Sequence, residues 1–200
     1  MKLTTSPLPY LGLALGLLTG CGRDEAPSPA AEAAYSRTVT YLDSASPSQL
    51  DSTLKSPAIK ALVLQNATYF TVFLQRQPDR EAVIFNFLRA KLPANPVGTY
   101  SFKTRQDDTP DVSLTYRIEI PDYRSPSAGG YHVYDRTIYS PTGSLIITAY
   151  DAERRLVSGR FEVTVPNAAD PFALKDDYLP RRSNLTLQGT FTNAPVQDTE

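Results

Sequence analysis

Alternation of apolar and polar residues runs through most of the chain beyond Ile59, and it constrains the fold more than any other feature of the sequence. In Val112–Ile120, the apolar Val, Leu, Tyr and Ile residues alternate with Ser, Thr, Arg and Glu. This is the pattern of a strand with one buried face and one solvated face. Leu156–Val165 and Leu185–Thr192 repeat the pattern. Because a helix would need a period near 3.6 residues, the alternation predicts an all-β domain.

Shorter segments of the same character predict further strands, and residues typical of turns separate them. These segments are Ala61–Gln65, Tyr69–Arg76, Ala82–Leu88, Gly98–Thr104, Tyr131–Tyr139 and Ser144–Tyr150. About nine short strands without long amphipathic helices indicate a single antiparallel β-sandwich or β-barrel. Nearer the N-terminus, Tyr35–Leu42 is a candidate first strand, and a Ser-Pro pair predicts a short helical turn in Ser46–Leu54.

The first twenty residues have the composition of a secretory signal. Lys2 precedes an apolar run from Leu8 to Leu18, which as a helix would cover only about half of a bilayer core. The only cysteine, Cys21, follows directly after small residues, and an Ala-, Pro- and Glu-rich stretch comes next. We therefore expect a signal peptide over residues 1–20, Cys21 and a flexible tether over residues 21–34, and an all-β domain over residues 35–200.

Leu18-Thr19-Gly20-Cys21 resembles the lipobox of bacterial lipoproteins, in which the cysteine thiol is acylated and becomes the new N-terminus. The resemblance implies that Cys21 is a lipid-attachment site and that the chain is bound to a membrane through this anchor. Arg23-Asp24-Glu25 looks like the acidic export signal of Bacteroidetes-type lipoproteins, which directs them to the outer face of the outer membrane. A charged linker without a targeting role is the alternative interpretation.

The C-terminal third is also similar to small Bacteroidetes-type lipoproteins of unknown function. In these, a strand ending in Asp leads through a turn into a Ser-Gly-Thr-Phe-like strand, and a Gly-x-Phe strand closes the domain. Gly143–Asp151, Val157–Phe161 and Gly189-Thr190-Phe191 follow this order. The resemblance implies an outer-membrane lipoprotein that faces the surface or the periplasm, and it supplies no catalytic residues.

Three glycines, at positions 98, 159 and 189, each stand two residues before an aromatic residue. Residues two apart in a strand share a face, so we expect a ring to cover the space left by the missing side chain, or a bulge to form there.

Composition excludes several functions. One cysteine and one histidine, His132, cannot supply the ligands of a zinc site or a disulfide framework, and we expect no metal and no cofactor. A net charge of −1 leaves no basic face for nucleic acid. The carboxylates Asp107, Asp108, Asp111, Asp176 and Asp177 lack the spacing of a calcium loop. Ser52 and Lys55 fit the Ser-x-x-Lys spacing of a helical nucleophile, without the motifs that accompany it.

Tyrosines gather around a Ser-, Pro- and Gly-rich loop and form the candidate ligand-binding residues, together with the histidine beside them. The candidates are Tyr123, Tyr131, His132 and Tyr134. Tyrosine rings suit sugars, peptides or hydrophobic ligands, although packing in or around the core explains them equally well. His132 with Asp135 could act as a general base, and a half-exposed strand histidine is the alternative.

We interpret the chain as a lipid-anchored, non-enzymatic binding or assembly-accessory module of the cell envelope. Its partner would be an envelope protein or an extracellular ligand. A hydrolase is one alternative, and it would need two buried carboxylates about 5–9 Å apart in one cleft. A lipocalin-like carrier is the other, and it would need a closed barrel with an apolar cavity of about 300 Å³ or more.

Overall fold

Strands make up almost all of the regular structure. The computed structural model describes residues 29–42, 49–55, 58–76, 78, 81–102, 112–120, 130–173 and 181–200. The strands are β1 (Glu32–Tyr41), β2 (Gln49–Lys55), β3 (Ile59–Gln65), β4 (Tyr69–Arg76), β5 (Glu81–Leu88), β6 (Gly98–Ser101), β7 (Ser113–Ile120), β8 (Gly130–Asp135), β9 (Thr142–Asp151), β10 (Leu156–Ala169) and β11 (Arg182–Asp198). One 3-10 helix, η1 (Arg89–Lys91), accompanies them, so the predicted all-β class is confirmed. Within these ranges, no helix is long and apolar enough to cross a membrane.

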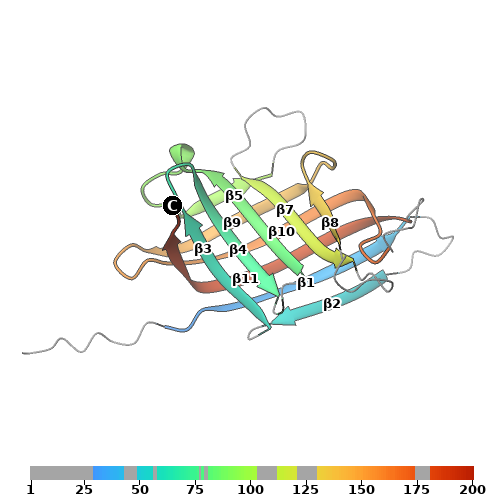
Figure 1. Cartoon of the computed structure of the whole chain (residues 1–200), viewed down its shortest axis with the longest axis horizontal. Helices are drawn as coiled ribbons and strands as arrows, with labels where there is room; N and C mark the ends of the chain where they lie inside the picture. The colour runs from blue at the N-terminus through green and yellow to red at the C-terminus, as the bar shows by residue number, and fades with distance from the viewer. Residues whose placement is uncertain are drawn as a thin grey trace, which may run out of the picture.

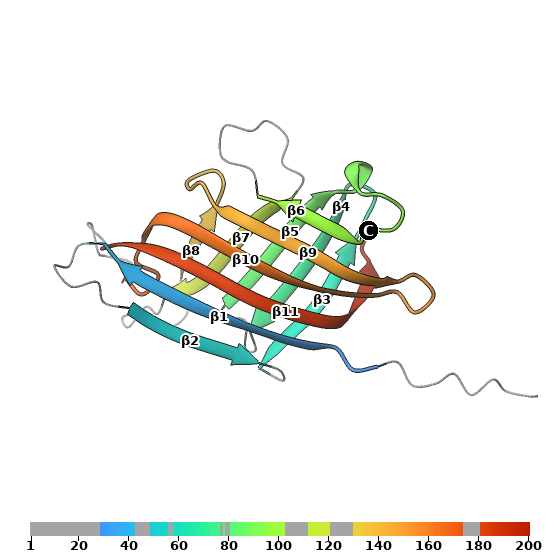
Figure 2. The same cartoon turned by 180° about the vertical axis from the view of Figure 1, so that it is seen from behind.

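The strands form two layers that share the long strand β11. We call β2-β1-β11-β10-β9-β6 the β11 layer, and β3-β4-β5-β7-β8 the β5 layer. The first part of β11 pairs with β1 and β10, whereas Val196–Asp198 pairs in parallel with β3. The β5 layer lies in front in Figure 1, and the β11 layer lies in front in Figure 2.

The layers also meet along a second line. Phe102, directly after β6, forms an isolated bridge with Val112, directly before β7. The sheet therefore curls into a half-barrel whose layers are connected through β11 and β3 on one side and through this bridge on the other.

Large aromatic and aliphatic side chains fill the space between the layers. Those that are almost completely buried are Tyr35, Tyr116, Tyr134, Phe70, Phe85, Phe87, Phe191, Leu74, Leu114, Leu145, Ile147 and Leu185. The ring centroids of Phe85 and Phe161 are 4.9 Å apart, as are those of Phe87 and Tyr100. Offset and edge contacts of this kind add stability beyond the buried area.

Three features of the strands differ from the expectation. The helical turn predicted in Ser46–Leu54 is wrong for residues 49–54, because residues 49–55 form β2 and pair along β1 from Gln49↔Thr40 to Lys55↔Ala34; residues 46–48 lie outside the described part of the chain. Hydrogen bonding to the edge of β1 outweighs the local Ser-Pro signal. The described chain has eleven strands instead of about nine, and β10 and β11 are 14 and 17 residues long.

Aromatic rings lie over all three glycines. At Gly98 the ring is that of Tyr100, two residues further along the same strand, as expected, whereas at Gly159 and Gly189 it comes from the neighbouring strand. In the pairing of β10 with β11, Gly159 lies opposite Phe191 and Phe161 lies opposite Gly189. A Cβ atom on Gly159 would lie 2.6 Å from the ring of Phe191, and one on Gly189 would lie 2.6 Å from the ring of Phe161. Each strand thus covers the glycine of the other strand with an aromatic ring, and a β-bulge lies beside these pairs.

We expect Gly189→Ala to lower the free energy of unfolding by about 1–3 kcal/mol, because the added methyl group would overlap the Phe161 ring and the Ala34 carbonyl oxygen, 2.7 Å away. Urea unfolding of the full chain measures the change. Gly98→Ala is the matched control, since the nearest atom to its Cβ, the Tyr100 hydroxyl, would be 3.7 Å away. Equal losses in the two variants would contradict the predicted overlap with the Phe161 ring.

Candidate functional site

A groove of about 640 Å³ lies on the outer face of the β11 layer. It extends over five neighbouring strands, β2, β1, β11, β10 and β9. The lining residues whose side chains point outward are Ala34, Ser36, Thr53, Ser144, Ile146, Arg160, Glu162, Gln188 and Thr190. These occupy outward positions because strand residues alternate between the packed interior and the surface.

The register of the strands aligns these residues in rows across the sheet. The first row is Thr53, Ser36, Gln188, Glu162 and Ser144, and the second is Ala34, Thr190, Arg160 and Ile146. Neighbouring strands are about 4.8 Å apart, so each row presents a new side chain at that interval. Side chains therefore line the groove at regular intervals along its length.

A third row, beside the groove, consists of threonines with an aspartate at its end. Its members are Asp51, Thr38, Thr186, Thr164 and Thr142. The Thr38 hydroxyl donates a hydrogen bond to Asp51 Oδ1 over 2.7 Å, and the Thr164 and Thr186 hydroxyls are 3.3 Å apart. Hydrogen bonds from Thr38 and Gln49 lower the pKa of Asp51. The outer face of the β11 layer is thus rich in hydroxyl groups.

The groove contains both hydrogen-bond donors and acceptors, and its two charged side chains, those of Arg160 and Glu162, have opposite signs. Arg160 and Glu162 are two residues apart on β10 and share its outward face. Gln188 Nε2 donates to Glu162 Oε1 over 3.4 Å. Side chains of this kind bind ligands through hydrogen bonds. In the part of the chain that the structure describes, there is no cluster of three or more His, Cys, Asp or Glu residues that could hold a metal.

A second polar cluster lies between the layers. On β1, Arg37 Nη1 donates hydrogen bonds to Glu81 Oε1 and to the Tyr116 hydroxyl, each over 2.8 Å. The Tyr116 hydroxyl donates to Glu81 Oε1 over 2.6 Å. All three side chains are buried, so the cluster ties the β11 layer to β5 and β7 of the other layer.

Burial and the charge of Glu81 shift the pKa values of the groups in and beside this cluster. Burial, followed by the charge of Glu81, raises the pKa of both Tyr35 and Tyr116. Burial by itself would lower the pKa of Arg37, but the Tyr116 and Glu81 groups outweigh it and raise that pKa. The arginine therefore stays charged and both phenols stay neutral at pH 7.

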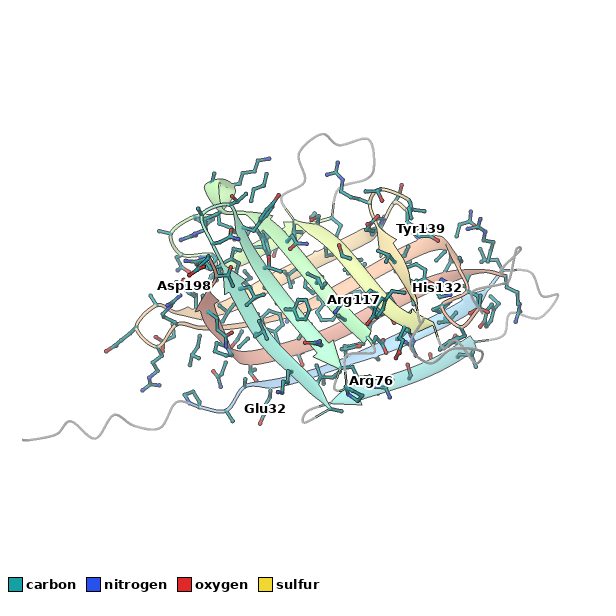
Figure 3. All side chains as sticks on the ribbon, in the orientation of Figure 1. Glu32, Arg76, Arg117, His132, Tyr139 and Asp198 are labelled. Carbon is teal, nitrogen blue, oxygen red and sulfur yellow. The ribbon has the colours of Figure 1, made fainter. Side chains whose placement is uncertain are left out.

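Aromatic and basic side chains surround the cluster. The Arg37 guanidinium carbon lies 4.9 Å from the centroid of the Phe172 ring, and Arg76 Nη1 lies 3.9 Å from Glu81 Oε2. Figure 3 shows Arg76 at the end of β4, and His132 on β8. Among the described residues, Glu81 is the only buried carboxylate, so they do not contain the buried pair that the hydrolase alternative requires.

The candidate residues that the structure describes, Tyr131, His132 and Tyr134, do not form one site. Tyr131 is 42% exposed, with the Arg117 guanidinium carbon 5.1 Å from its ring centroid. His132 Nε2 lies 2.9 Å from the carbonyl oxygen of Ala173. Successive strand residues face opposite sides, so Tyr131 points away from the interior that His132 and Tyr134 face.

Tyr134 belongs to the core. It is 1% exposed, its hydroxyl donates to the Ala169 carbonyl over 3.0 Å, and its ring lies between those of Tyr116 and Tyr139. Burial, followed by the Tyr139 and Asp170 charges, raises its pKa. Of the two explanations left open by the sequence, packing accounts for its contacts.

Other predictions lie outside the described residues. These are Tyr123, the acidic residues Asp107, Asp108, Asp111, Asp176 and Asp177, and the residues Leu18, Thr19, Gly20 and Cys21. The Ser-x-x-Lys spacing falls on β2, which lacks the helical turn that its chemistry needs.

Sequence reasoning missed both the groove and the buried ion pair. Ser and Thr at outward positions were visible, but their alignment depends on strand order. Arg37 carried a usable signal, because it shares the parity of the buried Tyr35 and Val39. The chain matches no protein-family model, and no curated protein matches it.

Proposed function

We propose that this protein is a lipid-anchored component of the cell envelope whose β domain acts as a binding module, with the groove on the β11 layer as its binding surface. The observation that carries the binding role is the alignment of hydroxyl, amide and charged side chains in rows over five strands. A hollow that combines apolar surface with polar groups at defined positions is typical of a ligand site.

The packing of the interior favours this role over the carrier alternative. The twelve largest fully buried side chains, nearly all of them Tyr, Phe or Leu, lie between the layers. Space that is filled by protein rings cannot hold a carried ligand. The outer face of the β11 layer carries hydroxyl, amide and charged side chains and is accessible, as a recognition surface needs to be.

The anchor is proposed from the N-terminal sequence. Cys21 is the only cysteine, and it follows Leu18-Thr19-Gly20 at the position where a lipobox places its acylated residue. β1 begins at Glu32, so the segment between the anchor and the domain can reach at most about 40 Å. The domain would then stay close to the outer membrane, on the surface or on the periplasmic side.

Expression of the full chain in a lipoprotein-competent Gram-negative host tests the location. We expect the intact mass to correspond to a chain beginning at acylated Cys21, and protease added to whole cells to remove the domain if it faces outward. Cys21→Ser is the control and should yield a protein without acyl chains. An unmodified Cys21 in a protein released from the membrane would refute the anchor.

A further inference from the structure

We infer that the groove takes a neutral, polyhydroxylated chain, that is, an oligosaccharide without charged groups, lying across the strands of the β11 layer. This inference rests on the proposed binding role of the groove and identifies the class of ligand. It is supported by the direction of the rows, by the chemistry of the side chains and by the balance of charge.

The direction of the rows favours a ligand that crosses the strands. Five strands at about 4.8 Å spacing give a surface about 19 Å long on which successive side chains are evenly placed. Backbone groups of β1, β11 and β10 are paired within the sheet, so a ligand over its face meets side chains. An extended peptide would instead pair with the backbone of an edge strand.

The side chains match the hydroxyl groups of a sugar. Ser36, Thr53, Ser144 and Thr190 each offer a hydroxyl that both donates and accepts hydrogen bonds. Every hydroxyl of a saccharide has the same dual capacity. Apolar atoms, those of Ala34 and Ile146 among them, make up more than half of the exposed lining and suit the C–H surfaces of sugar rings.

The charge of the groove favours a neutral ligand. Arg160 and Glu162 face it together, so a strongly acidic or basic polymer would meet one attractive and one repulsive group. A protein partner would need large anchoring side chains. The exposed Tyr131, Val133 and Ile138 lie instead on β8 and the turn after it, outside the residues that line the groove.

Methyl NMR of the full-length protein, in a detergent without a sugar headgroup, tests the inference. Three probes are added separately: a mixture of cellohexaose and maltohexaose, hexagalacturonate, and a hexapeptide of Ser and Thr. We expect the neutral hexasaccharides to shift the methyl resonances of Ile146 and Thr190 and to leave those of Val133 unchanged.

A matched pair of variants links the binding to the groove. Thr190→Val removes a lining hydroxyl at nearly constant shape and should weaken binding about fivefold, the equivalent of one hydrogen bond. Thr192→Val makes the same change on the outward face of β11 outside the groove lining and should leave the affinity unchanged.

The outcomes separate the two proposals. Shifts of Ile146 with hexagalacturonate or the peptide, but not with the neutral sugars, would overturn the ligand class and retain the binding role of the groove. Absence of shifts with all three probes, or equal shifts at Val133 and no effect of Thr190→Val, would overturn the binding role itself.

Discussion

Arg37→Met is expected to lower the free energy of unfolding by about 3–5 kcal/mol, a large part of the stability of a domain of this size. The substitution leaves the Glu81 carboxylate, 1% exposed, without the guanidinium that donates to it over 2.8 Å. It also removes a hydrogen bond to the Tyr116 hydroxyl. Urea unfolding of the full-length protein measures the loss.

Two controls separate the cost of a buried carboxylate that has lost its hydrogen-bonded guanidinium from the loss of packing. The triple variant Arg37→Met, Glu81→Leu and Tyr116→Phe replaces the whole polar cluster by apolar groups and should recover most of the stability. Asp198→Asn breaks the ion pair with Arg155, which lies on the surface, and should have a much smaller effect. If the triple variant were as unstable as Arg37→Met, packing would be the cause.

Alkaline unfolding is the second large effect. The pKa values of Tyr35, Tyr116 and Tyr134 are raised above 10.0 in the folded protein, chiefly by burial. Below pH 10 these phenols are protonated in both the folded and the unfolded state, so they do not make the free energy of unfolding depend on pH. Above pH 10 the unfolded chain releases up to three protons that the folded protein keeps. Stability should then fall by up to about 4 kcal/mol per pH unit.

Urea unfolding followed by circular dichroism between pH 9 and pH 12 measures this slope. Tyr134→Phe should reduce the slope by about a third, because one of the three retained protons is removed. Tyr69→Phe, at a residue that is 46% exposed, is the matched control. Ionisation of all tyrosines near pH 10 without loss of structure would contradict the prediction.

Alternation located most strands, because it reports directly which residues face the core. The predicted Tyr69–Arg76 coincides with β4, and Ala82–Leu88 lies within β5. β2 was predicted as a helical turn from the preceding Ser-Pro pair. Only two of its seven residues, Leu50 and Leu54, are apolar, and its conformation depends on pairing with the edge of β1. The parallel pairing of β11 with β3 also has no local signature in the sequence.

The groove could not be predicted because alternation identifies faces and not neighbours. Ser36 and Gln188 become adjacent only when β1 pairs with β11, far away in the sequence. The same holds for Arg37 and Glu81, which lie 44 positions apart and meet between the layers. Local patterns therefore gave the class of fold, whereas the sites depend on long-range pairing.

The place of β11 in its layer has a consequence for the order of folding. β11 is the last strand along the sequence, yet it lies between β1 and β10, and its end joins the other layer. Contacts between such distant segments slow folding. Until β11 has been synthesised, the position between β1 and β10 stays empty. The domain therefore closes, and its groove forms, only after synthesis has delivered β11.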